Sequence, residues 1–206
     1  MAMITNKYII LALVALSGVL SLQFECNKKF NCAENVYGFD LGIKAYPDKD
    51  SINVGDTLWL EVNSPTTLKD FRSGSMVDYS GAENLGSFIA FSKVEGATPK
   101  WVDAANKFNY KLIYGQDVTR SHFELGHEYT FIERNKQFQF LLAIIPKEKG
   151  TFRLGFSNAA NVYRQKDKCT KANFNLNFKN TNQHYYLSPF YQGGTFAGGD
   201  YYFEVY

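Results

Sequence analysis

Apolar residues recur at every second position along most of this chain, beginning just after residue 36. In the first such stretch Phe39, Leu41, Ile43 and Ala45 alternate with polar or small residues. A period of two residues places these side chains on one face of a β-strand, whereas a helix needs a period of about 3.6. The pattern returns at 52–54, 58–62, 85–94, 108–114, 129–132, 137–145, 152–156, 172–178 and 201–205. The chain is therefore predicted to fold into strands that each bury one face.

Turn-forming residues such as those at 47–50 separate these strands, which is typical of a β-sandwich. Aromatic residues make up 17% of the sequence, and this excess also favours strands. We predict one all-β domain over residues 37–206, an antiparallel sandwich of about nine strands. At most one short helix is expected, around Trp101 to Lys107.

The N-terminus has the proportions of a secretory signal. Lys7 precedes an apolar run of 14 residues, Ile9 to Leu22. A membrane-spanning helix needs about 20 apolar residues, so this run is better suited to an export signal. We expect a signal peptide at residues 1–25, a lead or tether at 26–36, and a protein that is periplasmic or anchored to the outer membrane.

Two ways of processing this signal remain open. Val19 and Ser21 suit cleavage before Leu22, which would release a soluble protein. Alternatively, Cys26 becomes a lipidated first residue, although Gln23-Phe24-Glu25 departs from the small residues that a lipobox requires. In the second case the only membrane contact is the N-terminal lipid anchor.

Three cysteines leave one without a disulfide partner in an oxidising compartment. If Cys26 carries lipid, the remaining pair is Cys32 with Cys169. We favour the Cys32–Cys169 bridge because it gives the third thiol a role. A bridge between Cys26 and Cys32 is the alternative.

Two segments resemble parts of an immunoglobulin-like sandwich domain. In Ser51–Val62 a Val-Gly-Asp turn leads into a strand with apolar residues at alternate positions, and Glu148–Leu154 resembles the turn into a late sandwich strand. As a whole, the chain is similar to uncharacterised exported proteins and lipoproteins of Gram-negative bacteria. This resemblance implies a fold type and a location, and it provides no catalytic residues to transfer.

Charge and motifs argue against several functions. The net charge is +2 and the basic residues form no stripe, so nucleic acid is not an expected partner. The densest cluster that could hold a metal or act as acid and base is His122, Glu124 and His127, and it matches no known zinc spacing. We interpret it as a solvated strand end and expect no metal, no cofactor and no enzymatic activity. A hydrolase remains the least favoured alternative.

Exposed aromatic residues are the candidate binding residues. Alternation places Trp59 opposite Leu58 and Leu60, and nine of the 22 residues from 185 to 206 are aromatic. From this tail, Phe190, Tyr191 and Phe196 lie in or beside glycine-rich sequence that could offer flat rings to a ligand. Packing of these rings within the protein is the simpler interpretation.

The resulting functional prediction is a non-catalytic module that binds a glycan or peptide in the cell envelope. Its partner would be a carbohydrate or another envelope protein, recognised through exposed rings. The alternative is a structural component of a surface or periplasmic complex, in which an edge strand pairs with a partner.

Overall fold

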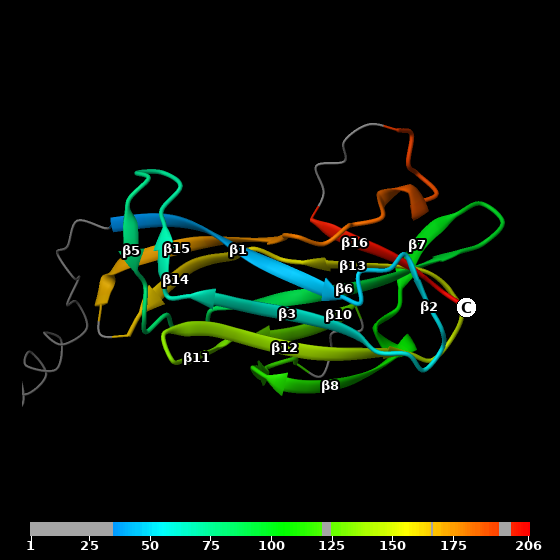
Figure 1. Ribbon diagram of the computed structural model, residues 1–206, viewed down its shortest axis with the longest axis horizontal. Coiled ribbons are helices and arrows are strands. Elements are labelled where there is room, and N and C mark those ends of the chain that lie inside the picture. The colour runs from blue at the N-terminus through cyan, green and yellow to red at the C-terminus, as the bar shows by residue number, and fades with distance from the viewer. Residues whose placement is uncertain (1–34, 121–124, 166, 194–198) are drawn as a thin grey trace, which may run out of the picture. The chain divides into compact units, whose positions relative to one another are not determined.

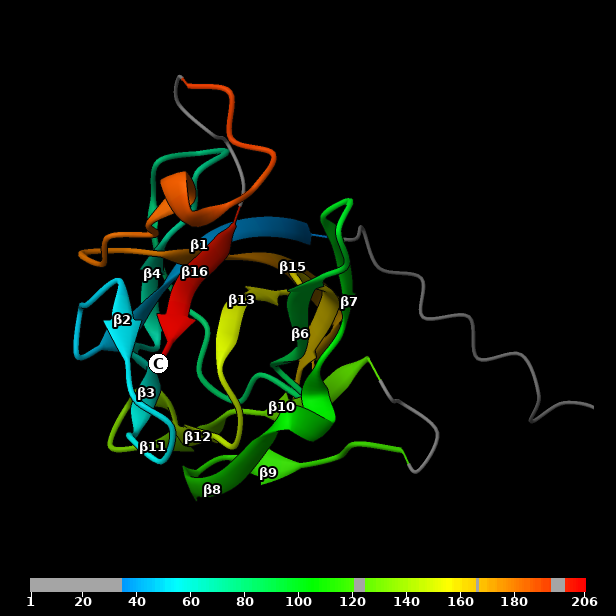
Figure 2. The same cartoon turned by 90° about the vertical axis from the view of Figure 1, so that its right-hand side faces the viewer.

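Two large β-sheets dominate the computed structural model, which describes residues 35–120, 125–165, 167–193 and 199–206 (Figure 1). Sheet A has the strand order β11 (Ile132–Arg134), β12 (Gln137–Pro146), β3 (Leu58–Pro65), β1 (Asn35–Tyr46), β15 (Asp167–Phe178) and β14 (Ala159–Arg164), with β8 (Phe108–Tyr114) also paired to β12. Sheet B has the order β2 (Ser51–Ile52), β16 (Asp200–Val205), β13 (Gly150–Phe156), β6 (Gly86–Glu95), β10 (Gly126–Thr130) and β9 (Gln116–Asp117), with β7 (Lys100–Asp103) also paired to β6. A separate hairpin joins β4 (Thr67–Lys69) and β5 (Met76–Asp78). The end-on view in Figure 2 shows both large sheets curling around a shared interior, so the all-β, sandwich-like prediction is confirmed.

The alternating apolar residues supply the layer between the sheets. Phe39, Leu41 and Ile43 are fully buried on β1, as the sequence pattern predicts. Much of the aromatic content lies in this layer: Phe39, Phe91, Phe138, Phe140, Phe152, Phe174, Phe203, Tyr79, Tyr129 and Tyr201 are all almost fully buried. Phe108 and Phe152 illustrate the packing, with ring centroids 4.9 Å apart and planes at 67°. Edge-to-face contacts of this kind stabilise an aromatic core beyond the area that they bury.

Strand direction differs from the prediction. β1 is antiparallel to β3 but parallel to β15, over pairs from Asn35 with Thr170 to Ile43 with Phe178. β16 and β2 are also parallel. The expectation of a purely antiparallel sandwich is therefore wrong. The physical reason is that alternation fixes which face a side chain occupies and carries no information on direction.

The number of strands and the helix also differ from the prediction. The described residues contain sixteen strands, against the nine or so expected, because short strands such as β4, β5, β7 and β9 lie outside the alternating stretches. The segment from Trp101 to Lys107, predicted as one short helix, is divided: its first half belongs to β7, where Trp101 pairs with Val94 of β6, and its second half is a 3-10 turn, η1 (Ala105–Lys107). A second 3-10 turn, η2 (Tyr185–Leu187), lies in the C-terminal tail. Pairing with β6 therefore overrides the local helical signal.

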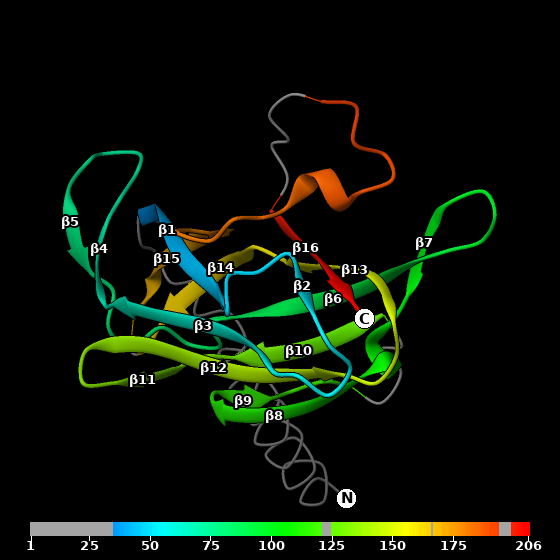
Figure 3. The same ribbon diagram turned by 45° about the vertical axis from the view of Figure 1, so that its right-hand side comes forward.

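The β4–β5 hairpin is fastened to β1 by a buried carboxylate. Asp70 is 2% exposed, and its Oδ1 accepts a hydrogen bond from the backbone N–H of Gly38 at 2.8 Å. Its Oδ2 accepts two bonds from Ser73, from the backbone N–H at 2.9 Å and from the hydroxyl at 2.6 Å. The Phe71 ring lies directly over Gly38, so that a Cβ atom there would fall 2.2 Å from Phe71 Cζ. Figure 3 shows this hairpin beyond the end of β3.

Tyr79 fastens the edge strand β14 to the core. The ring is fully buried and its hydroxyl donates a hydrogen bond of 2.7 Å to the carbonyl oxygen of Val162. Burial raises the pKa of Tyr79, although the guanidinium of Arg164 opposes this shift. The phenol therefore stays protonated and keeps its donor role at physiological pH.

Several predictions concern residues 1–34, which lie outside the described residues. These are the signal peptide, lipidation of Cys26 and the position of Cys32. Cys169 lies on β15, next to the residue that pairs with Asn35 at the start of β1. Within the described ranges, no helix has the length and apolar character needed to cross a bilayer.

Candidate functional site

Trp59 lies on the outer face of sheet A, as alternation predicts. Its neighbours Leu58 and Leu60 are buried on the inner face, while the indole is only partly buried. The antiparallel register places Tyr46 of β1 directly opposite Trp59. The two rings are stacked, with centroids 6.3 Å apart and planes that differ by 17°. Tyr46 is 37% exposed, so the pair forms an accessible aromatic surface.

Small and charged neighbours surround this aromatic pair. Ala143 of β12 is opposite Trp59 on the other side of β3 and is itself only 2% exposed. Two residues further along the strands, on the same face, Lys44 and Glu61 are opposite each other. Burial raises the pKa of Tyr46, and the negative charge of Glu61 adds to this effect. We call Tyr46, Trp59 and Ala143 the Trp59 platform.

Amide side chains continue this outer face along the strands. Asn63 follows Trp59 and Glu61 on the same face of β3, and Gln139 of β12 is opposite Asn63. The Gln139 side-chain amide donates a 3.4 Å hydrogen bond to the Gln137 side chain. The surface therefore changes from aromatic at one end of β3 to amide-rich at the other.

The C-terminal tail is divided between packing and exposure. Tyr185 packs against Tyr202 of β16, with ring centroids 6.0 Å apart. His184 is 4% exposed, and its Nδ1 lies 3.1 Å from the carbonyl oxygen of Tyr202. Phe190 and Tyr191 are 49% and 37% exposed. The first part of the tail is therefore anchored on sheet B, while these two predicted binding residues lie at the surface.

The predicted binding residues do not form one site. Trp59 belongs to the outer face of sheet A, whereas the tail that carries Phe190 and Tyr191 is anchored to β16 of sheet B. Phe196 lies outside the described residues. The structure thus presents Trp59 and the tail as two separate aromatic surfaces.

Sequence reasoning missed an aromatic cluster on the outer face of sheet B. The Arg153 guanidinium lies 4.8 Å from the centroid of the Trp101 ring, which packs against Tyr202. Arg153 also forms a 3.5 Å ion pair with Asp200. Burial raises the pKa of Asp200, and the positive charge of Arg153 offsets only part of this shift. The available signal was Tyr202 itself, which alternation places on the face opposite Tyr201 and Phe203.

The structure describes only part of the histidine cluster on which the hydrolase alternative depends. His122 and Glu124 lie outside the described residues. His127 of β10 is half-buried against Tyr110, with ring centroids 4.3 Å apart, and burial lowers its pKa. It packs against aromatic rings, so the interpretation as a solvated strand end does not describe it. In the ranges that the structure covers, no group of three histidine, cysteine or acidic residues could hold a metal ion.

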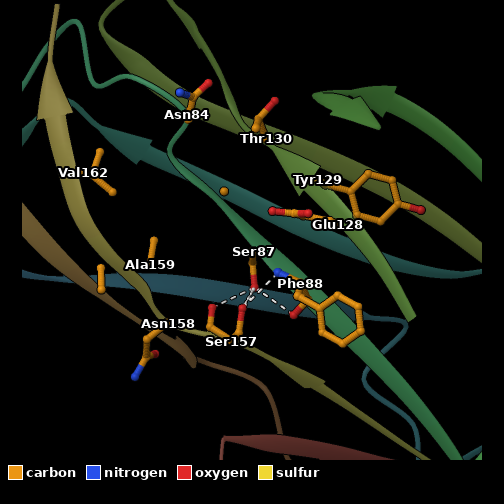
Figure 4. Close-up of a pocket in the computed structure, with 12 residues that line it drawn as sticks. Asn84, Ser87, Phe88, Glu128, Tyr129, Thr130, Ser157, Asn158, Ala159 and Val162 are labelled. Atoms are coloured by element: carbon orange, nitrogen blue, oxygen red, sulfur yellow. Dashed lines mark hydrogen bonds between the residues drawn. The ribbon is translucent and has the colours of Figure 1, made fainter. Parts of the chain in front are cut away.

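A pocket of about 200 Å³ lies beside β6, β10 and the start of β14 (Figure 4). Ser87 is 5% exposed and its hydroxyl donates a 2.8 Å hydrogen bond to the carbonyl oxygen of Ser157. The Ser157 hydroxyl in turn accepts a 2.9 Å bond from the backbone N–H of Phe88. None of the twelve described residues that line the pocket is a histidine, the base that most often activates a serine. These bonds tie β6 to the loop before β14, and the pocket carries no catalytic proposal.

Comparisons with known proteins add little to this geometry. No family model and no curated protein matches the chain. Among solved structures, the chain is similar to the human F-spondin reeler domain, with 11% identity and a TM-score of 0.36. That match covers 74% of this chain and 93% of the reeler domain. A similarity this low supports no argument about function, which therefore depends on the site itself.

Proposed function

We propose that this protein is an exported, non-catalytic binding module of the cell envelope that recognises a glycan or peptide through the Trp59 platform. The observation that carries the proposal is the stacking of Trp59 on Tyr46 at an outer sheet face. Large aromatic side chains exposed together on a surface are typical of recognition sites. Phe190 and Tyr191 provide a second exposed surface in the same proposal.

The remaining features of the proposal concern location and fold. We propose that the protein is secreted to the periplasm or anchored at the outer membrane through Cys26, and that its sandwich is immunoglobulin-like. A Cys32–Cys169 bridge belongs to the same proposal. It is supported by the register of β1 on β15, since Asn35 pairs with the residue next to Cys169. Such a bridge would link the lead segment to the domain.

A panel of cell-wall glycans and unstructured peptides, presented on a surface to the purified protein, tests the proposed function. We expect binding to one class, with a loss of at least about tenfold in Trp59→Ala, because an aromatic anchor contributes more than about 1.4 kcal/mol. Tyr191→Ala tests whether the tail surface contributes to binding separately from the Trp59 platform. Binding that both substitutions leave unchanged would contradict the proposal.

A role in assembly is the second candidate, and one observation favours it. Among the described strands β8 pairs only with β12, so its other edge is open. Ile113 and Tyr114 at its end are 40% and 38% exposed. An edge of this kind can accept a strand from a partner protein. This candidate predicts a stable complex that withstands Trp59→Ala and is lost when Ile113 is replaced by proline.

A further inference from the structure

We infer that the outer face of sheet A binds an uncharged, extended glycan that runs along β3 from the Trp59 platform to Asn63. This inference rests on the proposed function and specifies its ligand. It requires the aromatic end and the amide end of this face to bind the same glycan molecule.

The position of the platform within the sheet argues against an extended peptide. Trp59 lies on β3, between β12 and β1, so its strand has a paired neighbour on both sides. Tyr46 lies on β1 opposite Trp59, beyond the last residue that pairs with β15, and on that side the Ala45 N–H donates a 3.2 Å hydrogen bond to the Thr181 hydroxyl. A peptide that binds by strand addition needs an open edge. Recognition at the platform must instead use ring faces and side chains.

The two rings offer the apolar part of a glycan site. The rings are nearly parallel, with planes that differ by only 17°, so the ring surface that the stacked pair leaves uncovered is available to a ligand. A sugar ring carries C–H groups on its flat faces, and these pack against the electron-rich face of an aromatic ring. Ala143 next to Trp59 has no bulky side chain to stand above the ring.

The amides offer the polar part. Asn63 is exposed and lies four residues from Trp59 on the same face of β3, about 13 Å along the strand. Gln139 lies opposite it. Each side-chain amide both donates and accepts hydrogen bonds, which matches the hydroxyl groups of a sugar. The spacing means that a ligand must be several sugar units long to reach both ends.

The charges on this face favour an uncharged ligand. Lys44 and Glu61 have opposite charges and are directly opposite each other between the aromatic and amide ends. On the far side of β1, the Asn175 amide donates a 3.1 Å hydrogen bond to Asp40. Lys111 of β8 is opposite Ala143 on the same face, and the Lys179 side chain lies over Gly42 of β1. A polymer of either charge would therefore meet side chains of its own sign. Neutral chains avoid that repulsion.

Affinity gel electrophoresis of the purified full-length protein tests this inference. The gels contain mixed-linkage β-glucan, soluble starch, polygalacturonate or denatured casein. We expect retardation by a neutral glucan, with affinity that rises from its disaccharide to longer oligosaccharides. Trp59→Ala should lose at least about tenfold in affinity, and Asn63→Ala about fivefold. Trp59→Phe should retain most of the binding because it keeps an aromatic ring.

Matched controls come from the same chain. Trp101→Ala removes the tryptophan of sheet B, and Asn106→Ala removes an exposed asparagine outside sheet A. Both should retain affinity within about twofold, since surface changes away from a site have small effects. Circular dichroism confirms that each variant is folded.

The failures of the two proposals can be told apart. Retardation by casein or polygalacturonate alone, abolished by Trp59→Ala, would overturn the neutral glycan and leave the platform as a binding site. Neutral-glucan binding that Asn63→Ala leaves unchanged, or that does not depend on chain length, would overturn the extended path along β3. Retardation by none of the four probes would overturn both proposals.

Discussion

The carboxylate of Asp70 makes the sharpest prediction for stability. Burial alone would raise its pKa, but the bonds from Ser73, Gly38 and Arg72 outweigh burial and lower the pKa from 3.8 to about 2. A difference of this size between folded and unfolded chains corresponds to about 2 kcal/mol. Asp70→Asn keeps the side-chain volume but turns one acceptor into a donor that faces other donors. We expect it to lower the free energy of unfolding by about 2 kcal/mol at pH 7.

The pH dependence provides an independent test of the same carboxylate. A lowered pKa in the folded state means that ionised Asp70 stabilises the fold above pH 3.8. This contribution is lost as the pH falls toward 2. The difference in free energy of unfolding between wild type and Asp70→Asn should therefore have its full size at pH 7 and pH 5 and about half that size at pH 3. Urea unfolding followed by tryptophan fluorescence measures both proteins at each pH.

Asp103→Asn is the matched control, because this aspartate is exposed at the end of β7. It should change the free energy of unfolding by less than about 0.5 kcal/mol. A loss of that small size in Asp70→Asn at pH 7 would refute the reasoning. So would a large loss that is equal at pH 7 and pH 3, because the carboxylate charge would then have no part in it.

Three further predictions concern the anchoring of strands and the chain ends. Gly38→Ala should cost about 0.5–1 kcal/mol in urea unfolding, since its Cβ would lie 2.2 Å from the ring of Phe71, and this half-exposed ring must turn away from β1. Adding Phe71→Ala should restore most of that loss, and an unchanged midpoint in the single variant would contradict the close approach. Tyr79→Phe should cost about 1–2 kcal/mol, because a buried carbonyl of β14 loses its donor; an equal unfolding midpoint would contradict this. Peptide mapping without reductant should find Cys32 linked to Cys169, and any other pairing would contradict the proposed bridge.

The sequence pattern was sufficient to predict which face of a sheet a side chain occupies. It was insufficient to predict which residue of the next strand lies beside it. Alternation placed Phe39 inside and Trp59 outside, because a strand has only two faces. The partner of Trp59 could not be predicted in the same way. Tyr46 reaches it only through the register of β1 on β3, which depends on the whole sheet.

Three other features have a similar physical origin. Trp101 was expected to begin a short helix, yet pairing with β6 places it in the strand β7. Tyr202 faces outward and is still only 2% exposed, because Trp101 and Tyr185 pack against it. Asp70 is buried in a segment with no alternating pattern, so the hydrogen bonds that hold it were invisible before the fold was known. Each case is a tertiary contact that overrides a local signal.

The parallel pairing of β1 with β15 has a consequence for how the chain acquires its structure. Asn35 pairs with Thr170, so one edge of the first described strand stays open until the chain has been synthesised as far as β15. Contacts between such distant segments form late and slowly, because a long loop must close first. During that interval the apolar side of β1 and its open backbone edge are exposed to other chains. A factor that shields nascent chains should therefore raise the folding yield of the protein, and β1 is the strand that it should protect most.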